Sequence, residues 1–133
     1  MVSASQAGLD QYLWKNRLLL IFAPGERDPR LAKQLADMSR SKCGIRDRDI
    51  RIFRLVKDQP AVSADGREQD LDQVALRKAY GIRGGDFAAI LIGKDGGEKM
   101  RAFRPLPTNN LFEEVDAMPM RQDEIRTRLN DCS

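Results

Sequence analysis

The chain has 133 residues, the size of one domain with one hydrophobic core. It contains no histidine, which excludes nucleophiles activated by histidine as well as zinc or haem bound through histidine. With only two cysteines it cannot build an all-cysteine metal site, and we expect no metal and no other cofactor. No apolar run reaches the ~20 residues that a membrane-spanning helix needs.

The charged residues indicate a self-paired surface and no nucleic-acid partner. Of the 23 basic residues, 16 are arginines, which pair bidentately with carboxylate, phosphate or sulfate. The net charge is only +3, however, because 20 acidic residues are interspersed among them. The predicted strands also offer no pair of aromatic side chains on which bases could stack.

The first half of the chain predicts a strand, a helix and a second strand. Residues 17–23 form an unbroken apolar run, which is typical of a strand covered on both faces. An Asp-Pro pair at 28–29 then supplies an N-cap and a first helical residue. Apolar residues follow at helical spacing, and Gly44 is the expected stop. Residues 50–56 predict the second strand.

The second half predicts a helix, a hairpin and a closing helix. Residues 57–69 are polar and predict an irregular loop, after which Asp70 is expected to cap a helix. Residues 87–103 contain two strands joined by an Asp-Gly turn. Thr108 is expected to cap the closing helix, which Pro119 breaks. The resulting order is βαβαββα, an α/β fold with a central mixed sheet flanked by helices.

We divide the chain into three parts. Residues 1–8 are small and polar, without the features of a signal peptide, and are expected to form a flexible arm. Residues 9–120 form the domain, and residues 121–133 form a charged helical tail.

The order of the elements resembles that of thioredoxin, and so does the amino-acid sequence around the third long strand. The segment YGIRGGDFAAILIGKDGGEKMRAF is similar to the thioredoxin stretch that holds the cis-proline and the last hairpin. Here Asp86 stands at the position of the cis-proline, and residues 27–30 (RDPR) stand where a CGPC-type motif would. The resemblance implies a thioredoxin-like fold, and the two departures favour a chain without the usual thiol chemistry.

A closer resemblance extends over residues 9–127. The segments LDQYLWKNRLLLIFAPGERDPRL, FAAILIGKDGGEKMR and DAMPMRQDEIR resemble the bacterial P-DUDES family, a thioredoxin-like domain of unknown function. The domain is also found in secreted vertebrate matrix and sushi-repeat-containing proteins. The resemblance therefore implies export to the periplasm or the extracellular space, with the signal peptide absent from this chain. It leaves a cytoplasmic location open and implies no catalytic residue.

The turn that replaces the redox motif is a candidate binding site. A helix N-terminus flanked by Arg27 and Arg30, with Arg83 on a neighbouring loop, predicts a site for an anionic glycan or a protein partner. Alternatively, both arginines of the turn pair with adjacent acids such as Asp28. Asp86 is a candidate general acid or base, or the acceptor of a local turn hydrogen bond. The leading function is thus a non-catalytic binding or structural module.

The two cysteines leave three interpretations open. Cys43 and Cys132 could both be buried free thiols, or they could form one structural disulfide. In the third interpretation one of them serves an atypical thiol-dependent redox enzyme, a reductase or a peroxidase.

Several other residues are expected to be structural. Lys94, in the hairpin turn, is expected to be an exposed edge cation that blocks strand pairing. Tyr12 and Trp14 are expected to pack the N-terminal arm onto the sheet. A cluster of arginines is expected to form a solvated edge: Arg46, Arg48, Arg51 and Arg54.

Overall fold

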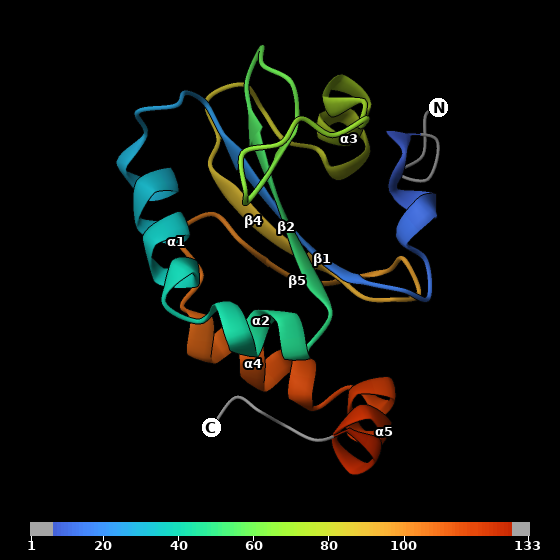
Figure 1. Cartoon of the computed structure of the whole chain (residues 1–133). Coiled ribbons are helices and arrows are strands. Elements are labelled where there is room, and N and C mark those ends of the chain that lie inside the picture. Colours follow the sequence, from blue (N-terminus) through green and yellow to red (C-terminus); the bar gives the residue numbers. More distant parts are fainter. Residues whose placement is uncertain (1–6, 129–133) are drawn as a thin grey trace.

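The computed structural model describes residues 7–128 (Figure 1). In this part of the chain, one mixed sheet has the strand order β3-β2-β1-β4-β5. β1 and β2 are parallel, and the other neighbouring pairs are antiparallel. The strands are β1 (Arg17–Ala23), β2 (Ile50–Val56), β3 (Val62–Ser63), β4 (Ala88–Ile92) and β5 (Glu98–Ala102). The helices are η2 (Leu9–Tyr12), α1 (Pro29–Ser39), α2 (Lys42–Asp47), α3 (Gln73–Tyr80), α4 (Thr108–Asp116) and α5 (Pro119–Thr127).

β1 is the central strand and is buried along its whole length, as its unbroken apolar sequence predicts. Its alternate side chains enter two separate cores. One core lies under α3 and the N-terminal segment, and the other lies under α1, α2 and α4 (Figure 1). Helices on both faces of a mixed sheet confirm the predicted α/β architecture.

α1 begins as predicted but ends earlier. The Asp28 carboxylate accepts a hydrogen bond from the backbone N–H of Arg30, and Pro29 is the first helical residue. The helix ends at Ser39, and a separate helix, α2, follows. The prediction of Gly44 as the stop was wrong, because this glycine lies inside α2. A Cβ there would come within 2.8 Å of the Phe112 ring, so the missing side chain allows α2 to approach α4.

Two predicted caps are also wrong. Asp72, not Asp70, caps α3, and it accepts from the backbone N–H of Ala75 at 3.0 Å. Thr108 is the first residue of α4, and its hydroxyl donates to Asp37 at 2.7 Å instead of capping the helix. The cap of α3 is thus a local contact two residues later than predicted, whereas the start of α4 is held by Asp37 of α1.

The N-terminal segment packs on the sheet through Tyr12 but not through Trp14. The rings of Tyr12 and Phe53 lie 5.4 Å apart between centroids, within the core under α3. Trp14 is 64% exposed, so its predicted packing was wrong. It occupies a left-handed turn with φ of 65°, and its backbone N–H donates to the Lys94 carbonyl.

A buried ion-pair network holds α5 against the start of β1. The Arg17 guanidinium is bidentate to the Glu124 carboxylate, at 3.0 and 3.1 Å. The Lys94 ammonium lies 2.8 Å from both Glu124 and Asp49. Arg121 adds a contact with Asp47 at 2.8 Å. Lys94 is only 7% exposed, so the prediction of an exposed edge cation was wrong.

Candidate functional site

The predicted anion site lies at the edge of the sheet where β1 ends and α1 begins (Figure 1). Both Arg30 and Asp28 belong to this turn, and Arg30 donates to the Asp28 carboxylate through Nε at 3.0 Å and Nη2 at 2.7 Å. These hydrogen bonds hold the pKa of Asp28 below its usual value and raise the pKa of Arg30. The Arg30 guanidinium also lies 5.5 Å from the centroid of the Phe87 ring. Arg30 is therefore engaged locally, whereas Arg27 is exposed.

The neighbouring loop brings two more of the predicted residues to this edge. Asp86 accepts a hydrogen bond from the backbone N–H of Arg83 at 3.1 Å, which is a local turn contact. Asp86 also interacts electrostatically with Arg30, so this loop and the α1 turn are neighbours. Arg83 is exposed.

Sequence reasoning missed two cations at the same edge. A Cβ on Gly84 would lie 3.0 Å from the Lys57 ammonium, which places Lys57 directly beside the loop. Lys57 follows β2, and the carboxyl ends of parallel strands meet at one edge, so the strand order could have indicated it. Arg77 lies beneath, donating to the carbonyls of Ala23 and Leu55 at 3.0 Å each. Burial lowers the pKa of Arg77. Its role is structural, because its hydrogen bonds connect the ends of β1 and β2.

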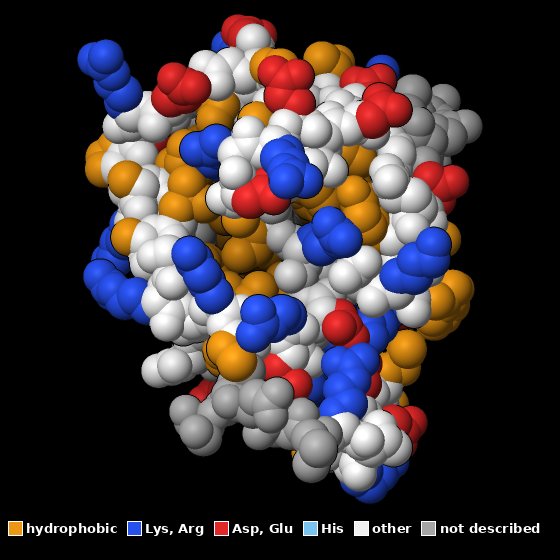
Figure 2. All heavy atoms as spheres, viewed as in Figure 1, with side chains coloured by type: hydrophobic (Ala, Val, Ile, Leu, Met, Phe, Trp, Pro, Cys, Tyr) orange, Lys and Arg blue, Asp and Glu red, His pale blue; other side chains and the backbone are white. Residues whose placement is uncertain are grey.

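A concave surface, which we call the β2 groove, lies between α1, α2 and β2. It has a volume of about 680 Å³. Figure 2 shows an apolar floor between α1 and the β2–β3 hairpin, with Lys and Arg side chains around it. The apolar lining residues are Leu35, Met38, Ile45, Ile50, Ile52 and Ala64, and the basic ones are Lys42, Arg46, Arg51 and Arg54. Of the arginines expected to form a solvated edge, Arg46 and Arg54 lie at the rim of this concave surface. For Arg48 the prediction was wrong, because Arg48 pairs with Asp116 at 2.9 Å and its side chain is only 15% exposed.

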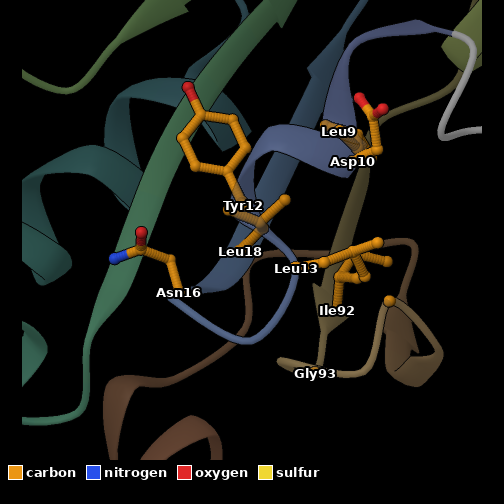
Figure 3. A pocket seen from close by; sticks show the side chains of 9 residues that line it. Leu9, Asp10, Tyr12, Leu13, Asn16, Leu18, Ile92 and Gly93 are labelled. Atoms are coloured by element: carbon orange, nitrogen blue, oxygen red, sulfur yellow. The ribbon is translucent and has the colours of Figure 1, made fainter.

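A second, small hollow lies between the N-terminal segment and the β4–β5 turn (Figure 3). Its volume is about 50 Å³, far below the ~300 Å³ at which pockets for organic ligands begin. In Figure 3 Leu13 lies beside Ile92, while the Tyr12 ring points away toward β2. We treat this hollow as part of the packing of the N-terminal segment.

Cys43 lies on α2, at the edge of the sheet opposite the α1 turn. This follows because α1 comes after β1 and α2 comes before β2, and the two strands are parallel. A guanidinium nitrogen of Arg46 lies 3.8 Å from the Cys43 sulfur. Among residues 7–128 no cysteine is free. Cys132 lies outside the described residues, so the bridge between the two cysteines stays a prediction.

Together the sheet and its helices define a thioredoxin-like α/β domain, with the Arg30–Asp28 pair at the N-terminus of α1. Residues 8–124 match the family described as "Domain of unknown function (DUF4174)", and the chain belongs to this family.

The chain is also similar to sushi repeat-containing proteins of vertebrates. It is 28% identical over 131 residues to the mouse sushi repeat-containing protein SRPX2, covering 96% of this chain and 28% of that protein. It is likewise 28% identical over 127 residues to the rat sushi repeat-containing protein SRPX, covering 93% of this chain and 27% of that protein. The chain therefore spans less than a third of these relatives.

Solved structures support the fold assignment. The reduced 2-Cys peroxiredoxin of Plasmodium vivax superposes with a TM-score of 0.64 at 14% identity, covering 92% of this chain and 77% of that one. Thioredoxin peroxidase I of Plasmodium yoelii superposes with a TM-score of 0.61 at 13% identity, covering 91% and 82%. At such low identity these neighbours show the thioredoxin-like fold alone.

Proposed function

We propose that this chain is a non-catalytic thioredoxin-like domain that serves as a binding or structural module. The observation that carries the proposal is the α1 turn. Thioredoxin chemistry needs a thiolate at a helix N-terminus, where backbone N–H groups and the helix dipole lower the thiol pKa. Here Asp28 is the N-cap of α1 and accepts hydrogen bonds from the Arg30 side chain, while Cys43 lies at the opposite edge of the sheet.

We further propose that the module belongs to an exported bacterial protein of the P-DUDES group. The resemblance of three segments to that group, and its occurrence in secreted sushi-repeat-containing proteins, support this location. No helix within residues 7–128 combines the length and the apolar character needed to cross a bilayer.

At the α1 edge, the proposed partner is a protein or an anionic glycan. Arg27, Arg83 and Lys57 are exposed cations here, whereas Arg30 is engaged by Asp28. The test is binding to a sulfated polysaccharide by the double variant Arg27→Glu and Arg83→Glu. Weaker binding supports the site, and unchanged binding contradicts it. The control for net charge is the double variant Lys15→Glu and Arg40→Glu, which reverses two exposed cations located before β1 and after α1, at the opposite edge.

The alternative function is an atypical thiol-dependent reductase or peroxidase that uses Cys43 or Cys132. It rests on the two cysteines of the sequence, and against it no cysteine within residues 7–128 is free. Insulin-disulfide reduction and peroxide consumption should both be absent if the domain is non-catalytic. An activity that is lost in Cys43→Ser would instead establish the enzyme.

A further inference from the structure

The β2 groove combines an apolar floor with basic side chains on its rim. Its floor includes Met38, Ile45, Ile50 and Ile52, which are buried, together with the half-buried Leu35. Among the described residues, the outer edge of β2 is paired from Ile52 onward, where Ala64 donates to the Ile52 carbonyl at 3.1 Å and β3 pairs with Phe53 and Arg54. The hairpin therefore leaves the first part of β2 uncovered.

The cations of the rim lie at both ends of this floor. Lys42 and Arg46 are exposed and four residues apart on α2, so they share one face of that helix. Arg54 lies on the same face of β2 as Ile50 and Ile52, about 13 Å beyond Ile50 at ~3.3 Å per strand residue. Arg51 points to the other face of the sheet, where its guanidinium lies 5.7 Å from the Tyr12 ring.

The acidic residues of the lining do not neutralise these cations. Asp49 already contacts Lys94 at 2.8 Å and Arg128 at 2.7 Å. Asp65 contacts Arg67 at 3.7 Å. Within residues 7–128, none of Lys42, Arg46 and Arg54 lies within ion-pair distance of a carboxylate. The groove therefore has a net positive rim over an apolar floor.

We propose that the β2 groove binds an amphipathic anion, a molecule with one carboxylate or sulfate head and an apolar chain or ring. The apolar body would cover the isoleucine floor, and the head would contact Arg46 or Arg54. A guanidinium favours such a head because it can donate two parallel hydrogen bonds to it. The volume of about 680 Å³ lies within the usual range for small organic ligands. This site is separate from the α1 edge, so the proposal for the groove does not depend on the result of the polysaccharide test.

The test uses decanoate as the probe and follows binding by methyl NMR of the full chain. Two matched compounds separate the contributions: acetate has the head without the chain, and decyltrimethylammonium has the chain with a positive head. We expect saturable decanoate shifts at Ile45, Ile50 and Ile52, no shifts with acetate at equal concentration, and at least about tenfold weaker binding of the cationic amphiphile. Equal binding of the two amphiphiles, or shifts that map elsewhere, would overturn the proposal.

Variants then locate the head group and the apolar floor. Combined Arg46→Glu and Arg54→Glu is expected to weaken decanoate binding by about tenfold, and added salt should weaken the wild-type affinity. Lys78→Glu, on the opposite face of the sheet, should leave the affinity unchanged. Leu35→Ala, which shortens a half-buried side chain at the margin of the floor, should also reduce binding in a variant whose methyl spectrum shows that it is folded. Unchanged affinity in the double arginine variant contradicts the site.

Discussion

Replacing Glu124 with Gln removes a carboxylate that joins α5 to the start of β1. Glu124 is 8% exposed and accepts hydrogen bonds from Arg17 and Lys94. Gln keeps the shape of the side chain but loses its charge. Its amide also places N–H groups against a guanidinium and an ammonium, both of which have donors only.

We expect Glu124→Gln to lower the free energy of unfolding by about 3 kcal/mol, as for a buried ion pair that loses one partner. Arg17 bears most of the loss, because it is 1% exposed and forms no ion pair with another acid in residues 7–128. Lys94 retains Asp49. The matched control is Asp123→Asn on the same helix, where the exposed pair with Arg126 contributes about 0.5 kcal/mol or less.

The loss should depend on pH. Burial by itself would raise the pKa of Glu124, but the hydrogen bonds from Arg17 and Lys94 outweigh it and hold this pKa below the ordinary 4.5. A carboxyl group with a lower pKa in the folded state stabilises the protein above its unfolded pKa, and this contribution is lost as pH falls through the folded pKa. The difference between wild type and variant should therefore be complete at neutral pH and shrink below pH 4.5.

Urea unfolding followed by far-ultraviolet circular dichroism measures the effect. Fluorescence is less suitable, since Trp14 is the only tryptophan and is already 64% exposed. A loss below about 1 kcal/mol at neutral pH would show that the pair is as weak as a solvated one. A loss that stays constant through the acidic range would show that the charge of Glu124 is not its cause.

Two further predictions concern α2. If Cys43 and Cys132 form the proposed bridge, the denatured, unreduced protein should show no free thiol, and reduction should lower the stability by ~4 kcal/mol; two titratable thiols would refute the bridge. Gly44→Ala should lower the free energy of unfolding by about 1–3 kcal/mol, in spite of the higher helix propensity of alanine. The reason is the 2.8 Å approach of the new Cβ to the Phe112 ring, so an equal effect of Gly85→Ala, where a Cβ meets nothing within 4 Å, would contradict the packing argument.

Elements with strong local patterns were predicted from the sequence. The apolar run of β1 indicated burial on both faces, and the Asp28–Pro29 pair indicated the start of α1. The location of the α1 turn beside the loop of Arg83 and Asp86 followed from the fold resemblance. The alternative in which Arg30 pairs with Asp28 was also foreseen, because the two residues are adjacent in the chain.

Other features depend on residues that are distant in sequence. Gly44 suggested a helix end, but the contact with Phe112 shows that it serves the packing of two helices. Lys94 was predicted to be an exposed cation at the sheet edge, but in the structure it is buried and forms ion pairs with Glu124 and Asp49. Neither partner could be inferred from the residues next to Lys94.

The sequence by itself determined the order of the main strands and helices, because capping, turn formation and hydrophobic periodicity act within a few residues. Only the tertiary structure decided which charges of distant segments are paired. It places Lys42, Arg46 and Arg54 around an apolar groove, while other basic side chains pair with carboxylates. The physical reason is that an ion pair requires its two charged groups to lie within about 4 Å, and for residues distant in sequence the fold sets that distance.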